Sequence, residues 1–134
     1  MKYNINRKIH NDFSVIEENK LPARSWFIPF SGKEALEKSD YKNERYLSDR
    51  VQMLSGDWDF KYYAKLSEIP EAFDSAKIRF DKATVPSTWQ RTGYENPCYL
   101  NTRYEFPMTL PNVPSEMSAG IYVKKFNISS AAVN

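Results

Sequence analysis

Two carboxylates in this sequence stand close enough together to suggest acid–base chemistry. Asp57 and Asp59 are separated by one residue, so on an extended strand their Cα atoms would lie about 6.6 Å apart. This spacing falls within the roughly 6.5–9.5 Å between the acid and the base of inverting glycosidases. Trp58 and Phe60 alternate with the aspartates, however, which places both carboxylates on the solvent face beside Lys61. A general acid needs an apolar environment, so we interpret both aspartates as solvated and expect no catalytic residue.

The cysteine and histidine content argues against a nucleophile or a metal site. Cys98 has no histidine or basic cluster nearby that would stabilise a thiolate, and we expect it to be small and partly buried. His10 lies among Lys8, Asn11 and Asp12, which predicts a surface residue. One cysteine and one histidine cannot form an intrachain disulfide or a zinc site. We therefore expect no cofactor and no metal ion in this segment.

Asn101 is the residue whose chemistry best suits a sugar. Its amide offers two donors and a carbonyl acceptor, which match the mixed character of sugar hydroxyls. The alternative is an asparagine that ends a strand or forms a turn and bonds its own backbone. From the residues alone the backbone role is the more frequent one.

The chain is rich in aromatic residues, with 9 Tyr, 8 Phe and 3 Trp. Trp89, Tyr94, Tyr99 and Tyr104 form a dense set that could stack on the apolar face of a pyranose ring. Buried aromatics are much commoner in a β-sandwich, so we expect Trp58 and Trp89 to be core or interface anchors. We expect a structural role for the whole set, and Tyr99 is the member most open to a sugar contact.

Short strands are needed to position these side chains, and the second part of the chain predicts several. Alternation over 57–62, after a turn at Gly56, is typical of a half-buried strand. Further strands are expected from 78 to 80, from 83 to 85 and from 120 to 128, with prolines between them. Four or five strands are about half of the eight in a jelly roll. The predicted fold is therefore all-β, a partial jelly-roll sandwich.

The first fifty residues have a different pattern. Little periodicity is visible apart from the apolar cluster at 26–30, so 1–50 are predicted to form an extended, irregular arm. Ser31 and Glu34 have the spacing of a capping box, which predicts a short helix ending at Lys38. The expected division is an arm at 1–50 and an incomplete jelly-roll domain at 51–134.

Composition excludes several classes of function. The formal net charge is +2 and the two signs are interleaved, without the basic stripe of a nucleic-acid-binding protein. No apolar run has transmembrane length and the first residues do not resemble a signal peptide. We therefore expect no nucleic acid or membrane partner, and a cytoplasmic location.

Four stretches, in order, carry a resemblance to a known family. The chain resembles the front of family 2 glycoside hydrolases of the large β-galactosidase type. The matching residues are 19–24 (NKLPAR), 54–60 (LSGDWDF), 85–90 (VPSTWQ) and 93–101 (GYENPCYLN), followed by 120–122. Ser55 stands where that family usually has asparagine, Leu110 where a Pro-Pro pair is common, and Met117 where asparagine is frequent.

The resemblance implies a function for the full-length enzyme and assigns sugar binding and catalysis to different domains. It implies a jelly-roll sugar-binding domain of a retaining β-galactosidase that hydrolyses terminal β-D-galactosyl residues of lactose-type substrates. Asn101 would contact the galactosyl group. A barrel further along the enzyme would supply two catalytic glutamates, with Mg and Na ions near them, and the full-length enzyme would be a homo-oligomer. The chain by itself is expected to be inactive.

Other roles stay open. A carbohydrate-binding module, a structural complementation segment without activity, or the same domain of a β-glucuronidase or β-mannosidase would share much of this pattern. The element at 97–101 with the link at 113–114 favours the β-galactosidase interpretation.

Overall fold

The computed structural model describes residues 1–99, 101–102, 111–112, 114 and 116–128. Over these residues the regular structure is mainly short antiparallel strands, with a single six-residue α-helix and three 3₁₀ turns. The strand content confirms the all-β prediction. The chain forms two compact units: Met1–Asn19 with Gly56–Lys124, and Lys20–Ser55 with the residues from 125 onward. Whether 1–50 and 51–134 are separate domains stays a prediction.

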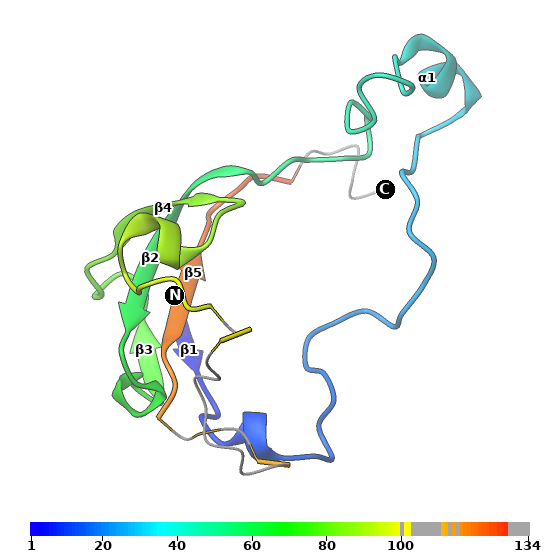
Figure 1. The fold of residues 1–134 in the computed structure, drawn as a ribbon. Helices are drawn as coiled ribbons and strands as arrows, with labels where there is room; N and C mark the ends of the chain where they lie inside the picture. Colours follow the sequence, from blue (N-terminus) through cyan, green and yellow to red (C-terminus); the bar gives the residue numbers. More distant parts are fainter. Residues whose placement is uncertain (100, 103–110, 113, 115, 129–134) are drawn as a thin grey trace. The chain divides into compact units, whose positions relative to one another are not determined.

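A three-stranded antiparallel sheet is the main element of the first unit. Its central strand is β2 (Gly56–Tyr63), flanked by β4 (Asp81–Val85) and β5 (Ala119–Val123) (Figure 1). The predicted alternation from Asp57 to Tyr62 therefore forms a strand. The register pairs Trp58 with Ala83 and Phe60 with Tyr122, so the apolar face of β2 continues onto both neighbours.

A second, two-stranded sheet uses the start of the chain. Strand β1 (Lys2–Asn4) pairs antiparallel with β3 (Ala72–Asp74). The terminal ammonium of Met1 donates to Asp74 Oδ1 at 3.0 Å, and the rings of Tyr3 and Phe73 stack with centroids 5.2 Å apart. The sequence predicts an irregular arm here, and that description is wrong for these residues. Three-residue strands are too short to produce a recognisable period.

The other three strand predictions have different outcomes. Residues 78–80 are not a strand, because the chain turns after β3 with Lys77 N donating to Asp74 O at 2.9 Å, and β4 begins at Asp81. The prediction for 83–85 is confirmed within β4. The last strand ends at Val123, five residues before its predicted end at 128, and Lys124 there donates to Asp57 O at 2.9 Å.

In the second unit, helix α1 (Lys33–Lys38) ends where the sequence predicts. The predicted capping box is wrong, since Gly32 is the N-cap and no side chain caps the helix. The backbone N–H of Ser31 instead donates to Asp49 Oδ1 at 3.1 Å. Nearby, the Ser48 hydroxyl donates to the carbonyl of Pro29. Local side-chain bonds therefore hold this unit together.

The core of the first unit centres on Phe60, which has 0% of its surface exposed. Its ring centroid lies 4.5 Å from that of Tyr122, 5.0 Å from that of Tyr94 and 6.2 Å from that of Trp89. Gly120 makes room for this ring, because a Cβ there would lie 2.6 Å from Phe60 Cε2. The structural role predicted for Trp89 is confirmed.

Candidate functional site

Asn101 lies in an exposed turn. Thr102 closes this turn on Tyr99, donating to its carbonyl from the backbone nitrogen at 3.2 Å and from the hydroxyl at 3.1 Å. Tyr99 itself has 77% of its surface exposed. The turn thus presents an amide and an aromatic ring to the outside, while the contact of Asn101 with a sugar stays a prediction. Tyr104, the other aromatic considered for this region, lies outside the described residues.

The segment before this turn is held by a half-buried carboxylate, Glu95. Its Oε2 accepts from Trp89 Nε1 at 2.7 Å and from Gln90 Nε2 at 2.9 Å, and its Oε1 accepts from the Tyr62 hydroxyl at 2.9 Å. Ser118, just before β5, adds a further side-chain hydrogen bond. A single carboxylate therefore ties together β2, the 3₁₀ turn η3 (Trp89–Thr92) and the approach to β5.

The electrostatics of this carboxylate are set by two opposed effects. Burial raises the pKa of Glu95, but the hydrogen bonds from Ser118, Trp89, Tyr62 and Gln90 together lower the pKa below its ordinary value. The pKa of Tyr62 is raised by burial and by the nearby Glu95 charge. Glu95 is thus an ionised acceptor near neutral pH, which suits a structural anchor and not a general acid.

A glycine brings Glu95 to its donors. Gly93 follows η3 with φ of 89°, a left-handed conformation that glycine adopts without strain. The backbone N–H of Gly93 donates to the Gln90 carbonyl at 3.4 Å, and the backbone N–H of Tyr94 donates to the Trp89 carbonyl at 3.2 Å. The chain therefore reverses directly after Trp89 and Gln90. This places Glu95 next to the side chains of the two residues that begin the turn.

The sequence contains a local signal for the structural role of Glu95, which an analysis of composition and periodicity does not detect. A glutamate two residues after a turn glycine, close to a tryptophan and a glutamine, has two donors within six residues. The third donor, Tyr62, is 33 residues away along the chain, and only the sheet brings it near.

Asp57 and Asp59 occupy the solvent side of β2, as predicted. Each faces its register partner on β4: Lys82 Nζ lies 2.5 Å from Asp59 Oδ1, and the Thr84 hydroxyl donates to Asp57 Oδ1 at 3.4 Å. These are cross-strand surface pairs, which stabilise the pairing of β2 with β4. The arrangement does not resemble a catalytic carboxylate pair.

The two remaining candidates differ from their predictions in burial. Cys98 is exposed and not partly buried, because it lies in the open segment after Pro97. His10 is half-buried where a surface position was predicted, and its Nε2 lies 3.1 Å from Asn11 Nδ2. The short 3₁₀ turn η1 (Ile9–Asn11) carries it into a pocket of the first unit.

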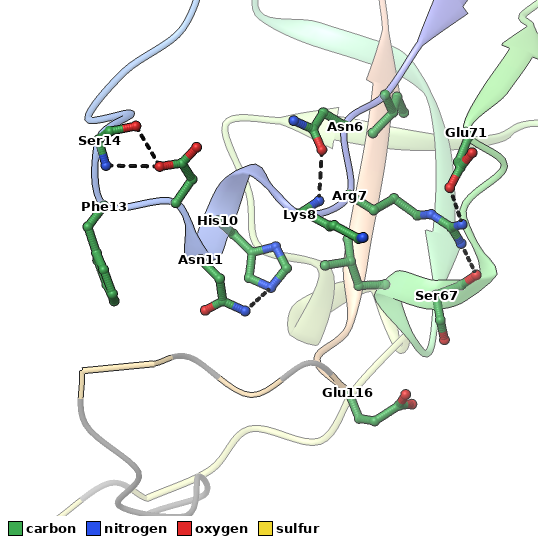
Figure 2. A pocket seen from close by; sticks show the side chains of 13 residues that line it. Asn6, Arg7, Lys8, His10, Asn11, Phe13, Ser14, Ser67, Glu71 and Glu116 are labelled. Atoms are coloured by element: carbon green, nitrogen blue, oxygen red, sulfur yellow. Dashed lines mark hydrogen bonds and ion pairs between the residues drawn. The ribbon is translucent and has the colours of Figure 1, made fainter.

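This pocket of about 1120 Å³ lies between the first residues of the chain and the segment around η2 (Leu66–Glu68) (Figure 2). Many of its polar groups bond one another. Arg7 donates to the Ser67 carbonyl at 2.6 Å and to Glu71 at 2.7 Å, and Asp12 accepts from Ser14. Arg7 lowers the pKa of Glu71 by its hydrogen bond and its charge. These contacts hold the chain start against the strands, and Asn101 is not among the lining residues.

Two further properties concern the described part of the chain. There, no three His, Cys, Asp or Glu side chains lie together in a way that could hold a metal ion. No helix within the same residues has the length and apolar character to cross a membrane.

Comparison with known proteins gives a consistent result. Residues 51–134 match the model of the sugar binding domain of glycosyl hydrolases family 2. A β-galactosidase of Staphylococcus xylosus is 36% identical over 127 residues, which are 92% of this chain and 12% of that enzyme. A β-galactosidase of Alteromonas mediterranea is 31% identical over 90% of this chain and 11% of its own length. One of Leuconostoc mesenteroides is 38% identical over 63% of this chain and 8% of its own. The chain thus spans 8–12% of the length of these curated relatives.

Proposed function

Because the chain belongs to glycosyl hydrolase family 2, through the sugar binding domain that residues 51–134 match, we propose that it is the amino-terminal part of a retaining β-galactosidase. The full-length enzyme would hydrolyse terminal β-D-galactosyl residues of lactose-type substrates. The observation that carries this proposal is the similarity to β-galactosidases over about 90% of the chain. A cytoplasmic homo-oligomer is part of the same proposal.

Asn101 is the residue of this chain that we assign to the galactosyl site. Its exposed position in the turn closed by Thr102 supports the assignment, since the amide is accessible. An amide can donate to one sugar hydroxyl and accept from another. Asn101 would thus orient the galactosyl ring while groups elsewhere in the enzyme cleave the bond.

The chemical step itself is assigned to the rest of the enzyme. Hydrolysis of a glycoside with retention requires an acid and a nucleophile about 5–5.5 Å apart, and the aspartates of β2 are engaged in cross-strand pairs. Mg²⁺ and Na⁺ ions near the catalytic glutamates of the full-length enzyme belong to the same proposal. The 134-residue chain by itself should show no turnover of a nitrophenyl β-galactoside.

The decisive experiment compares two asparagines of one loop in the full-length enzyme. Two neutral hydrogen bonds at about 0.5–1.5 kcal/mol each correspond to a roughly 10–100-fold lower kcat/KM for Asn101→Ala. Asn96→Ala, at another exposed position five residues away, should change kcat/KM less than about twofold. Steady-state kinetics with melting curves distinguish the two. A folded Asn101→Ala enzyme with wild-type kinetics would remove Asn101 from the site.

A binding module without catalysis is the second candidate. The exposed Tyr99 beside Asn101 favours it, because an aromatic ring next to an amide is a common way to hold a sugar. Titration of the isolated chain with galactose separates the two proposals. Binding with a Kd in the millimolar range or tighter, kept in the absence of the rest of the enzyme, would favour the module.

A further inference from the structure

We propose that Glu95 is a positioning residue that fixes the loop carrying Asn101, and so sets how the enzyme orients the galactosyl ring. This inference rests on the proposed function, since it assigns Glu95 a role through Asn101. Glu95 does not need to touch the sugar. Its side chain faces inward to Tyr62, Trp89 and Gln90.

The first argument is the number and origin of its partners. The donors come from β2, from η3 and from the residue before β5, and those three elements are separate in sequence. Both carboxylate oxygens are used, Oε1 by Tyr62 and Oε2 by Trp89 and Gln90. Hydrogen bonds to a charged acceptor are about twice as strong as neutral ones. Glu95 therefore has one position relative to the sheet.

The second argument is the short distance along the chain from Glu95 to Asn101. Six residues separate them, and two restraints act in between. Pro97 has a fixed φ, and Thr102 closes the turn on the Tyr99 carbonyl. Gly93, before Glu95 in the chain, is fixed by η3. A displacement of Glu95 therefore moves the start of the segment that ends at Asn101.

The third argument is that the neutral isostere of this carboxylate holds its donors more weakly. Trp89 Nε1 and the Tyr62 hydroxyl both donate to Glu95, and an indole nitrogen can only donate. In Glu95→Gln the remaining oxygen must therefore face Trp89, and the NH₂ group takes the place of the oxygen that accepts from Tyr62, whose hydroxyl can also accept. Shape is kept while the negative charge and the charge-assisted bonds are lost, so the variant tests anchoring without creating a cavity.

The test is a double-mutant cycle in the full-length β-galactosidase. Glu95→Gln, Asn101→Ala and the double variant are compared for kcat and KM on a nitrophenyl β-galactoside, with melting temperatures for each. We expect Glu95→Gln to lower kcat/KM about tenfold, with the same division between kcat and KM as Asn101→Ala. In the Asn101→Ala background the same change should cost less than about twofold, because coupled residues are not additive. Glu71→Gln, which removes an exposed carboxylate paired with Arg7, is the control and should stay within about twofold.

Each outcome decides between the two proposals. If Asn101→Ala has no effect in a folded enzyme, the proposed site is wrong and the role of Glu95 fails with it. If Asn101→Ala lowers kcat/KM but Glu95→Gln does not, or if the two effects multiply, the positioning role alone is overturned. Should Glu95→Gln fail to fold, Gln90→Ala removes one of the donors instead and enters the same cycle. A loss that persists in the Asn101→Ala background would then count against the proposal.

Discussion

The two units of this chain use similar aromatic residues to opposite effect. In the first unit the aromatic rings of Tyr94 and Tyr122 pack on Phe60, which is fully buried. In the second, Trp26 and Phe27 have 65% and 57% of their surface exposed, and arginine side chains lie over their rings. Aromatic content by itself therefore does not predict a core.

The difference lies in how far along the chain the contacts reach. The first unit is closed by strand pairs between distant segments, such as Phe60 with Tyr122. In the second unit, the hydrogen bonds described within 20–55 join residues fewer than twenty positions apart, such as Ser31 with Asp49. A sheet has a continuous face, and rings on that face can be buried by other side chains that pack on it. A short helix with turns buries little aromatic surface. Four predictions test this contrast, in order of decreasing effect.

The largest expected effect is the loss of the central ring. Phe60→Ala should lower the free energy of unfolding by about 3–5 kcal/mol, because it leaves a cavity under Trp89 and Tyr94. The matched change Phe27→Ala should cost about 1 kcal/mol or less, since the residue is 57% exposed and its cation–π contact with Arg24 at 5.1 Å is a weak surface interaction. Urea unfolding followed by circular dichroism measures both values. Equal losses would mean that the second unit has a core of its own.

A smaller effect is expected from adding one methyl group. In Gly120→Ala the new Cβ would lie 2.6 Å from Phe60 Cε2 and 2.9 Å from Trp89 Cζ3, so rings must move. Overpacking of this kind costs about 1–3 kcal/mol. Gly32→Ala in the second unit has no heavy atom within 4 Å of the added group, and we expect less than about 1 kcal/mol. The same urea titrations apply, and a neutral Gly120→Ala would show that the ring cluster can shift freely.

The third prediction concerns acid. The pKa of Glu95 is lowered in the fold, so its contribution to stability is complete above the ordinary glutamate pKa and is lost as the pH falls through the lowered value. Glu95→Gln should therefore flatten the fall in stability below about pH 4.5. The pKa of Asp49 is lowered by hydrogen bonds from Ser31. Asp49→Asn should therefore flatten the fall in stability at low pH as well, but for the second unit alone. Melting curves from pH 3 to 7, recorded by tryptophan fluorescence and by proteolysis, separate the units. A parallel pH profile for Glu95→Gln and wild type would contradict the prediction.

The smallest effect is expected from the surface ion pairs. Asp59 and Lys82 pair across β2 and β4, with side chains 39% and 69% exposed. Lys82→Ala should cost between 0 and about 1 kcal/mol, and Lys33→Ala, which removes the pair with Glu37 in α1, about 0.5 kcal/mol or less. Both losses should shrink in 1 M salt. A salt-independent cost above about 2 kcal/mol for Lys82→Ala would place that lysine in a structural network.

The sequence predicts the parts of the fold that have a long enough period. Strand β2 has three full alternations and was located nearly to the residue, whereas β1 and β3 have three residues each and show none. The region 78–80 contains Ile78 and Phe80 in strand spacing, yet it only connects the turn at 74–77 to β4, which begins at Asp81. The local pattern does not show whether a neighbouring strand is available for pairing.

The candidate site divides in the same way. The solvent position of Asp57 and Asp59 follows from the alternation along β2. Glu95 could not be found by that rule, because its role depends on Tyr62 and Trp89 meeting at one point through the sheet. Cys98 was misplaced for the opposite reason: cysteine is often buried, but here it follows Pro97 in an open segment.

The pairing of β1 with β3 has a consequence for synthesis. Lys2 meets Asp74 in that sheet, so the first strand made by the ribosome must wait for about 70 more residues. At about 5–20 residues per second this delay is roughly 4–14 s. Strand β2, by contrast, meets β4 about 25 residues later, as Trp58 opposite Ala83. Strand β1 thus stays unpaired over a longer stretch of synthesis than β2, until β3 has emerged. A nascent chain shorter than about 70 residues should therefore have residues 2–4 open to chaperones and proteases.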